Sequence, residues 1–240
     1  MKKLFAVLGL LAALAAGSFA QEEASQAEQY YSQGKFSAAL NLYEDELKNA
    51  PNNPYVYYNI GNCYFKMGSM GLAVANYYRA FRLAPRDGDI RHNLNLAMES
   101  AGEHLVPGGM PEVLHKLFFL LSYNELKGLA MLCLGAFSLL LCIWIINRRF
   151  GKTVWALLAA LIICGGWLYL RRGQEMQVLA VVASPTAELR SGPGTNFPAS
   201  ANLTHGHLVI LKDSRNHWEE VIVKSQGIQG WIKSESLEKI

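Results

Sequence analysis

The sequence predicts a multidomain membrane protein made of an all-α repeat solenoid, a transmembrane helical hairpin and a small all-β barrel. Three observations lead to this fold class. Two long apolar runs lie close together at residues 126–147 and 154–170, a spacing of 34 residues recurs before them, and short strand-like segments follow them. The 240 residues are 51% hydrophobic with a mean hydropathy of +0.12, which suits a membrane protein with water-soluble parts.

Charge and cysteine content exclude several classes of function. The formal net charge of +3 is too weak to indicate nucleic acid as a partner. Three of the four cysteines lie inside the apolar runs, which leaves Cys63 alone in the water-soluble parts and predicts no disulfide there. No Cys/His cluster has the spacing of a zinc site, so we expect no metal and no cofactor.

Residues 1–20 predict a secretory signal peptide. Lys2 and Lys3 precede a short apolar core, and the small residues Ser18 and Ala20 stand at the spacing of a cleavage site. The mature chain is then expected to begin near Gln21. An uncleaved anchor is the alternative, and in both cases the segment that follows is exported.

Residues 21–102 repeat with a period of 34. Small residues at matched positions let two helices approach closely, tyrosines fill the remaining space, and prolines end each helix pair because proline cannot continue the hydrogen-bond ladder. The pairs that carry the period are Tyr30 and Tyr64, Ala39 and Ala73, Tyr43 and Tyr77, and Pro51 and Pro85. This pattern resembles the tetratricopeptide repeat, and we expect about two repeats followed by a capping helix at residues 89–101.

The resemblance to tetratricopeptide repeats implies a concave groove, lined by the first helix of each repeat, that binds peptides and partner proteins. The alternative is that most tyrosines in these positions only pack helix against helix. Too few groove lysines, arginines and asparagines are present to indicate a C-terminal carboxylate as ligand. By repeat position the groove residues are Tyr31, Tyr55, Tyr58, Asn59, Asn62, Phe65 and Lys66.

Residues 103–125 predict a linker and an interfacial helix. Prolines and glycines fill residues 106–111, which indicates a linker. Residues 112–121 are apolar but too few to span a bilayer, so we expect a helix that lies in the membrane plane. Ser122 with Glu125 three residues later has the pattern of a capping box and predicts a new helix at the start of the first span.

The two apolar runs predict a membrane hairpin, since about 20 helical residues cross a bilayer core. Arg148, Arg149 and Lys152 lie in the connecting loop, residues 148–153, and the positive-inside rule places that loop in the cytoplasm. Arg171 and Arg172 after the second run argue for the opposite orientation, and the predicted signal peptide decides between them. A buried pair of helices in a soluble protein is the alternative, but the flanking modules are too small to enclose it.

Residues 176–240 predict a small β module with strands at residues 177–183, 208–211, 218–223 and 230–232. The segment 187–195, Phe197-Pro198 and the closing Gly230-Trp231-Ile232 resemble the signature of bacterial SH3 (SH3b) domains. His205 and His207 alternate in this module and are expected to be a solvated or hydrogen-bonded pair.

Members of the bacterial SH3 family bind peptides or the peptide stems of the cell wall. The resemblance implies five partner-binding positions in the β module: Arg190, Asn196, Phe197, Trp218 and Trp231. For the two tryptophans, packing in the barrel core is the alternative.

The order of signal, repeats, two spans and SH3 module resembles the BatE-like members of the Bat-type (Bacteroides aerotolerance operon) family. That resemblance implies a membrane-anchored scaffold that works with von Willebrand A-type membrane proteins and a MoxR-type ATPase. We expect it in the bacterial inner membrane, with the repeats and the SH3 module on the periplasmic side. The alternative function is a peptidoglycan-binding adaptor that recruits an envelope enzyme.

The sequence predicts a protein that is not an enzyme. It contains no GxSxG, HExxH or phosphate-binding loop motif. Catalysis by a nucleophile also needs a base placed beside it. Cys63, the one thiol outside the apolar runs, falls within a predicted repeat helix, which is a poor place for a reactive nucleophile.

Overall fold

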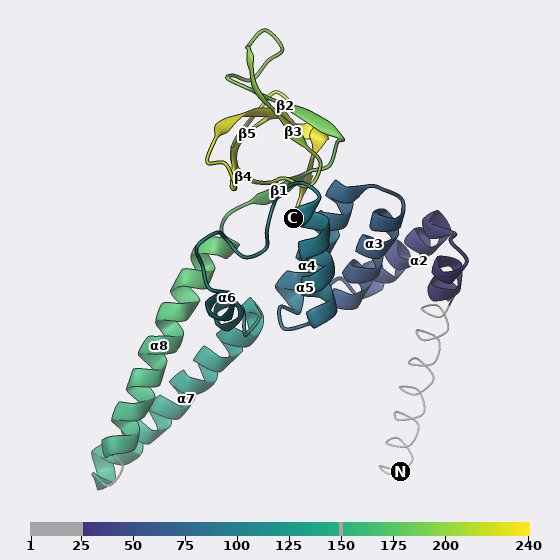
Figure 1. Cartoon of the computed structure of the whole chain (residues 1–240). Helices are drawn as coiled ribbons and strands as arrows, with labels where there is room; N and C mark the ends of the chain where they lie inside the picture. Colours follow the sequence, from purple (N-terminus) through teal and green to yellow (C-terminus); the bar gives the residue numbers. More distant parts are fainter. Residues whose placement is uncertain (1–25, 149–150) are drawn as a thin grey trace.

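The computed structural model describes residues 26–148 and 151–240 of the chain. The predicted signal peptide, residues 1–20, lies outside the described residues, and so does Arg149 of the hairpin loop. Figure 1 shows a stack of helices, a long helical hairpin and a ring of strands that meet at one place. The predicted layout of helical repeats, two apolar helices and a C-terminal β module is therefore confirmed.

The repeat domain is a stack of antiparallel helices. Two of its helices begin at polar side chains that accept backbone hydrogen bonds: Asn53 accepts from the N–H of Tyr55, and Asp87 from those of Asp89 and Ile90. Gly61 is required by packing, because a Cβ there would come within 2.6 Å of the Tyr77 ring. The helices are residues 26–32, α2 (Phe36–Asn49), α3 (Pro54–Lys66), α4 (Met70–Leu83) and α5 (Gly88–Glu99).

After the linker come a short helix, α6 (Glu112–Phe118), and the two hairpin helices, α7 (Tyr123–Asn147) and α8 (Gly151–Glu175). Ser122 and Glu125 form the predicted capping box at the start of α7. Both hairpin helices are long and apolar enough to span a membrane. Each extends beyond the predicted span, and α8 continues past Arg171 and Arg172 to Glu175.

The C-terminal module is one antiparallel sheet of seven strands in the order β3-β2-β6-β5-β4-β1-β7, which curls into a ring (Figure 1). We call it the β barrel. The prediction matches β5, but β2, β3 and β7 were not predicted as strands. The strands are β1 (Leu179–Val182), β2 (Thr186–Arg190), β3 (Ala199–Thr204), β4 (Leu208–Arg215), β5 (Trp218–Val223), β6 (Gln229–Lys233) and β7 (Leu237–Lys239), with a 3₁₀ turn at Ser234–Ser236.

The β barrel is docked on the repeat domain through β1. Successive side chains of a strand point to opposite faces, and β1 is buried on both. Ala180 and Val182 belong to the barrel core, whereas Val181 belongs to a core shared with α4 and α5. Gly71 of α4 makes this contact close, because a Cβ at that position would lie 2.3 Å from the carbonyl oxygen of Val182.

A buried hydrogen-bonded contact fixes the same junction from the linker side. Glu103 follows the last repeat helix and is only 5% exposed. Its carboxylate lies 2.7 Å from Nδ1 of His207 and accepts a hydrogen bond from the Ser225 hydroxyl at 2.5 Å. His207 is therefore paired across the junction rather than with His205.

The end of α4 also connects to the hairpin and to the last strand. Arg79 pairs with Glu238 of β7 at 2.6 Å, and Arg82 pairs with Glu175 at the end of α8. These contacts join segments that are far apart in the sequence. The repeat domain, the barrel and the upper end of the hairpin thus form one packed unit.

Arg171 of α8 has a structural role that the sequence reasoning did not find. Its side chain is nearly fully buried, donates a hydrogen bond to the carbonyl of Phe118 and lies 4.4 Å from the ring centroid of Phe119. The indole of Trp167 donates to the same carbonyl at 3.0 Å. Arg171 therefore helps to hold the end of α6 against α8, and its charge was a poor guide to orientation.

The close approach at Gly71 gives a direct test of the docking. Gly71→Ala is expected to lower the free energy of unfolding by about 1–3 kcal/mol, as overpacking does, because the backbone of β1 must move away. Chemical unfolding of the purified chain in detergent measures this change, and proteolysis at residues 104–111 reports separation of the barrel.

The control is Gly88→Ala, near the start of α5, where an added Cβ meets nothing within 4 Å. Both glycines lie in the first turn of a helix, so the gain in helix propensity is similar for the two variants. Equal stability of the two variants would contradict the docking geometry.

Candidate partner-binding surfaces

The first helices of the repeats form the candidate groove. Residues three and four apart share one side of a helix, so Tyr55, Tyr58, Asn62 and Lys66 follow one another along α3. Tyr55 and Lys66 are exposed at the two ends of this row, and Tyr55 retains 58% of its surface. Their exposure makes these two side chains the ones most available to a partner.

The middle of the groove is a polar network that connects three helices. Asn93 of α5 donates hydrogen bonds to the hydroxyl of Tyr58 at 2.9 Å and to the side-chain oxygen of Asn62 at 3.2 Å. The hydroxyl of Tyr77, on α4, donates to the same oxygen of Asn62 at 2.7 Å. The structure therefore brings Tyr58 and Asn62 together.

Asn93 was not among the predicted groove residues. The 34-residue period relates it to Asn59, which was predicted, so the signal was present in the sequence. It was missed because the third helix was treated only as a cap.

The remaining groove residues are more dispersed. The ring of Tyr31 packs edge to face against Phe36, with 5.3 Å between the centroids. Asn59 is half-buried on α3, and Phe65 packs from the same helix against the core that contains α4. Tyr31 and Phe65 therefore contribute mainly to packing between helices.

The thiol beneath the groove is well shielded. Cys63 has no exposed surface, and its burial raises the pKa of the thiol to about 11. Thiolates, not thiols, act as nucleophiles. Near neutral pH this side chain is a small apolar group of the helix interface.

The two tryptophans of the β barrel lie on its outer face. Val221 and Ile232 point into the barrel core, so the alternation of a strand turns Trp218 and Trp231 to the other side. They are nevertheless only 9% and 8% exposed, and Arg215 lies over the Trp231 ring at 5.6 Å.

Arg190 connects Trp231 with the loop between β2 and β3. It stands opposite Trp231 in the register of β2 and β6. Its guanidinium donates to the carbonyls of Thr195 and Phe197 at 2.9 and 2.5 Å. Arg190 thus positions this loop.

The tip of the β2–β3 loop presents two of the predicted residues. Asn196 is exposed, and Phe197 keeps 37% of its surface. The Phe197 ring covers Gly192, where a Cβ would lie within 2.6 Å of it. The glycine therefore allows Phe197 to fold back over the loop beside Arg190.

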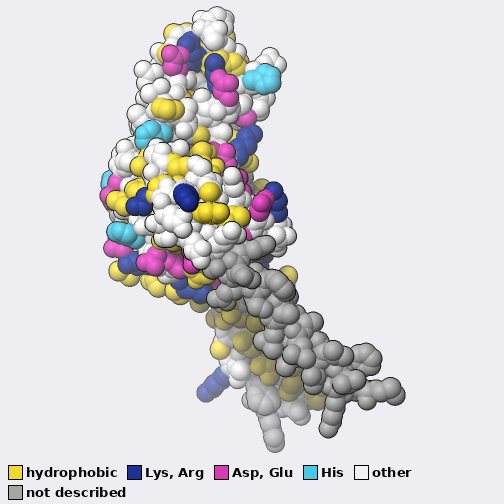
Figure 2. All heavy atoms as spheres, turned by 90° about the vertical axis from the view of Figure 1, so that its right-hand side faces the viewer, with side chains coloured by type: hydrophobic (Ala, Val, Ile, Leu, Met, Phe, Trp, Pro, Cys, Tyr) yellow, Lys and Arg dark blue, Asp and Glu magenta, His cyan; other side chains and the backbone are white. Residues whose placement is uncertain are grey.

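The groove and the outer barrel face are separate surfaces. The barrel packs mainly against α4, the second helix of its pair, and shares a core with α5, whereas the groove residues lie mainly on α3. Figure 2 shows the end of the repeat stack, where hydrophobic side chains alternate with charges of both signs.

Within the described residues no group of three or more His, Cys, Asp or Glu side chains is arranged to hold a metal ion.

Comparison with known proteins confirms the repeats. A model described as TPR repeat matches residues 27–68, and the Tetratricopeptide repeat model matches residues 54–87. Tetratricopeptide repeat protein 16 of Homo sapiens and of Macaca fascicularis is 29% identical over 72 residues, which are 30% of this chain and 8% of theirs. The chain thus spans less than a tenth of the length of these relatives.

Solved structures with repeats of this kind are also similar, at low overall overlap. The translocator chaperone SycD of Yersinia enterocolitica matches with a TM-score of 0.33 at 14% identity, covering 65% of this chain and 86% of that one. The first TPR of Spaghetti (RPAP3), bound to an HSP90 peptide, gives 0.33 at 15% identity, covering 60% and 93%.

The polar network in the groove gives a prediction about stability. Tyr77→Phe removes the hydroxyl that donates to Asn62 and is expected to lower the free energy of unfolding by about 1 kcal/mol. Thermal or chemical unfolding in detergent measures the loss. Tyr57→Phe is the matched control, since the Tyr57 hydroxyl has no hydrogen-bond partner among the described residues. An unchanged midpoint for Tyr77→Phe would show that the network adds no stability.

Proposed function

We propose that the chain is a membrane-anchored scaffold that assembles partner proteins through its repeat groove and the outer face of its β barrel. The observation that carries the proposal is the pair of repeats at residues 27–87, in which Tyr55 and Lys66 stand exposed along one helix face. Repeats of this kind bind peptides and proteins, so protein partners are expected.

The exposed apolar surface of the hairpin supports a membrane location. Contiguous apolar patches of more than a few hundred Å² are rare on soluble monomers, and in lipid they need no cover. Of the most apolar stretches of α7 and α8, only 0% and 11% is buried within the structure. Large side chains more than 60% exposed on these helices include Met131, Leu132, Leu139, Ile145, Ile146, Trp155, Ile162 and Ile163.

Helix α6 supports the same placement. Val113, Leu114 and Leu117 are each more than half exposed, whereas His115 on its other side is buried against Phe81 and Phe119. A helix with one apolar exposed side and one packed side suits the headgroup region of a bilayer. We place α6 in the membrane plane, as the sequence predicts.

The proposal extends to the finer identity suggested by the order of modules. The barrel belongs to the bacterial SH3 type, and the whole resembles the Bat-type scaffolds that work with von Willebrand A-type membrane proteins. Arg148 and Lys152 at the tip of the hairpin support a cytoplasmic loop, with both modules in the periplasm. Shielded Cys63 supports a scaffold without catalysis of its own.

A peptidoglycan-binding adaptor is the second candidate function. The observation in its favour is that Arg190 donates to the backbone carbonyl of Phe197 and stands opposite Trp231 in the strand register, which gives a cation and two aromatic side chains at one end of the barrel. Retention of the purified full chain on wall sacculi, lost in Phe197→Ala and kept in Lys212→Ala, would favour this function over the first.

The groove is tested by cross-linking in intact membranes. Tyr55→Ala combined with Lys66→Ala is expected to lower recovery of the cross-linked partner proteins by at least about tenfold, since a few exposed anchors dominate such interfaces. Mass spectrometry of the captured neighbours measures the recovery. Lys212→Ala on β4 is the control. Unchanged capture by the double variant would rule out the groove as the contact.

The topology is tested with single cysteines placed in a cysteine-free chain. Asn52→Cys in the repeats and Lys212→Cys in the barrel are expected to react with a membrane-impermeant maleimide on intact spheroplasts. Lys152→Cys in the loop should react only after permeabilisation, because the hairpin carries it across the bilayer. Labelling of Lys152→Cys alone on intact cells would reverse the proposed orientation.

A further inference from the structure

Two hollows lie on either side of the linker, where the three parts of the chain meet. An apolar chamber of about 610 Å³ lies between α4, α6, α8 and the barrel. A basic groove of about 920 Å³ lies between the start of α5 and α6. The two share His104, Leu105, Val106 and Met110 as walls, so they are neighbours across the linker.

The chamber has mainly aromatic and aliphatic walls, with polar side chains such as Glu103, Gln174 and Lys224 in part of its lining. Phe81 of α4 and Phe119 after α6 lie 5.2 Å apart between ring centroids, and Leu170 closes the side toward α8. Its volume falls within the range of about 300–1,000 Å³ in which proteins hold small ligands. Leu170 and Phe119 stand where the hairpin joins the other two parts, so the chamber lies beside the end of the hairpin.

The basic groove contains Arg91, which forms no salt bridge among the described residues, although the Glu112 carboxylate on α6 attracts it from a greater distance. Arg91 is half-buried, and no carboxylate among the described residues lies within salt-bridge distance of it. Its guanidinium lies 5.6 Å from the Phe81 ring centroid and 3.5 Å from Nδ1 of His115. Burial disfavours the charge of Arg91, and Glu112 is already paired with Lys116, so a further anion would complete the site.

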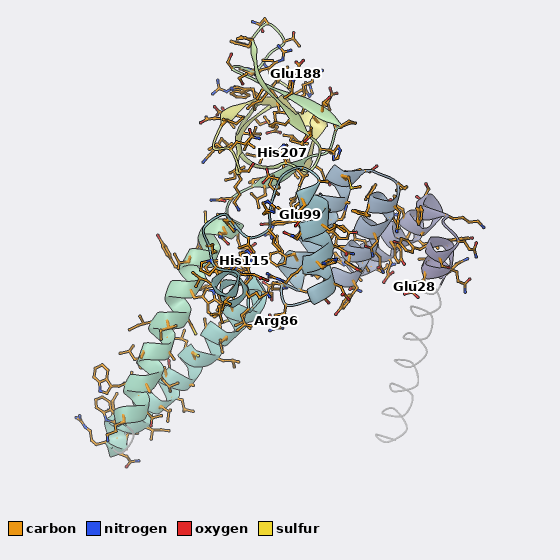
Figure 3. The ribbon with its side chains drawn as sticks, in the orientation of Figure 1. Glu28, Arg86, Glu99, His115, Glu188 and His207 are labelled. Atoms are coloured by element: carbon orange, nitrogen blue, oxygen red, sulfur yellow. The ribbon has the colours of Figure 1, made fainter. Side chains whose placement is uncertain are left out.

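Two further cations border the same groove. Arg86 pairs with Glu125 at 2.6 Å, and Lys116 pairs with Glu112 at 2.7 Å. Both pairs are more than 40% exposed, so they contribute little stability and their cations can turn toward another anion. Figure 3 shows Arg86 at the lower end of the repeat domain and His115 on α6 beside it, both at the top of the hairpin.

We propose that the junction binds one anionic phospholipid of the surrounding bilayer. Its phosphate lies against Arg91, Arg86 and Lys116, and one acyl chain passes Met110 and Leu105 into the apolar chamber. A lipid can reach the groove from the membrane surface, because Leu120 and Lys116 of the groove adjoin the exposed apolar side of α6. The inference rests on the proposed membrane anchoring.

A free phosphate would satisfy the three cations but would leave the neighbouring chamber unused. An uncharged lipid without a phosphate, such as diacylglycerol, would fill the chamber but would bring no anion to the three cations. A phospholipid with an anionic headgroup uses both hollows at once, and it is the one ligand already concentrated at this surface.

The test measures lipid bound to the purified full chain in mild detergent by native mass spectrometry, with phosphatidylglycerol and phosphatidylcholine as the competing probes. We expect the chain to retain phosphatidylglycerol at least about tenfold better, because the choline ammonium of phosphatidylcholine offsets the charge of its phosphate and is repelled by the three cations of the groove. Equal retention of the two lipids overturns the proposal. Displacement of phosphatidylglycerol by millimolar inorganic phosphate would identify an anion site without a role for the chamber and would equally overturn it.

Three variants locate the site. Arg91→Gln is expected to remove the preference for phosphatidylglycerol, and Met110→Trp to reduce retention of both lipids by filling the passage between the hollows. Lys212→Gln removes an exposed charge from β4 and is expected to behave as the unmodified chain. Met110 is 40% exposed, so its replacement tests the site even where Arg91→Gln weakens folding.

Failure of this inference is distinct from failure of the scaffold. A chain that resists carbonate extraction and captures partners, but retains no phosphatidylglycerol, overturns the lipid site alone. A chain extracted by carbonate loses the membrane anchoring and the lipid site together.

Discussion

The close approach of helix α4 to strand β1 is the constraint on which the rest of the structure depends. It is made possible by a glycine: at Gly71 the backbone of the helix lies against the carbonyl of Val182, with no room for a side chain. The contact is closed on its other side by Glu103, whose buried carboxylate is satisfied by His207 and Ser225. A buried charge is stable only when it is paired and hydrogen-bonded. The first residues of the linker, around Glu103, are therefore a fixed part of the interface. The prolines and glycines that follow them had indicated only a linker.

Helix α4 contacts the groove helices, the β barrel and the end of the hairpin. One side carries Tyr77, which closes the polar network of the groove, and the core on its other side includes Val181 of the barrel. Its last turn reaches the hairpin through Arg82 and Glu175. Because protein interiors are close-packed, a displacement of this helix cannot be absorbed locally. A partner that moves the α3–α5 groove therefore acts on a helix that also seats the barrel and the top of α8.

Local patterns in the sequence were sufficient for the repeats and for the apolar helices, and they failed where contacts are distant. The period of 34 residues places small residues such as Gly61 and Ala73 where helices touch, so the pattern and the packing have the same cause. Strands β2 and β3 were missed because many of their residues are polar. In addition, β3 includes Ser200 and Asn202, which are residue types that favour turns. One feature of the sequence does indicate that the barrel is docked. The run Leu179–Val182 is apolar on both faces, which is typical of a strand covered on both sides. Its second cover, α4, lies about 100 residues away, and no local rule identifies it.

The packed junction also constrains the membrane helices between its parts. Repeats and barrel share a core and the buried contact between Glu103 and His207, so both must lie on the same side of any membrane that the chain crosses. An even number of spans satisfies this requirement, and an odd number would separate Glu103 from His207. Charge counting at the ends of the second span was ambiguous because Arg171 and Arg172 were weighed together. Arg171 is buried against Phe118 and Phe119, and its charge is directed into the protein rather than to the lipid surface. With that charge removed from the count, only Arg172 opposes the cations at the hairpin tip, which supports the proposed cytoplasmic loop.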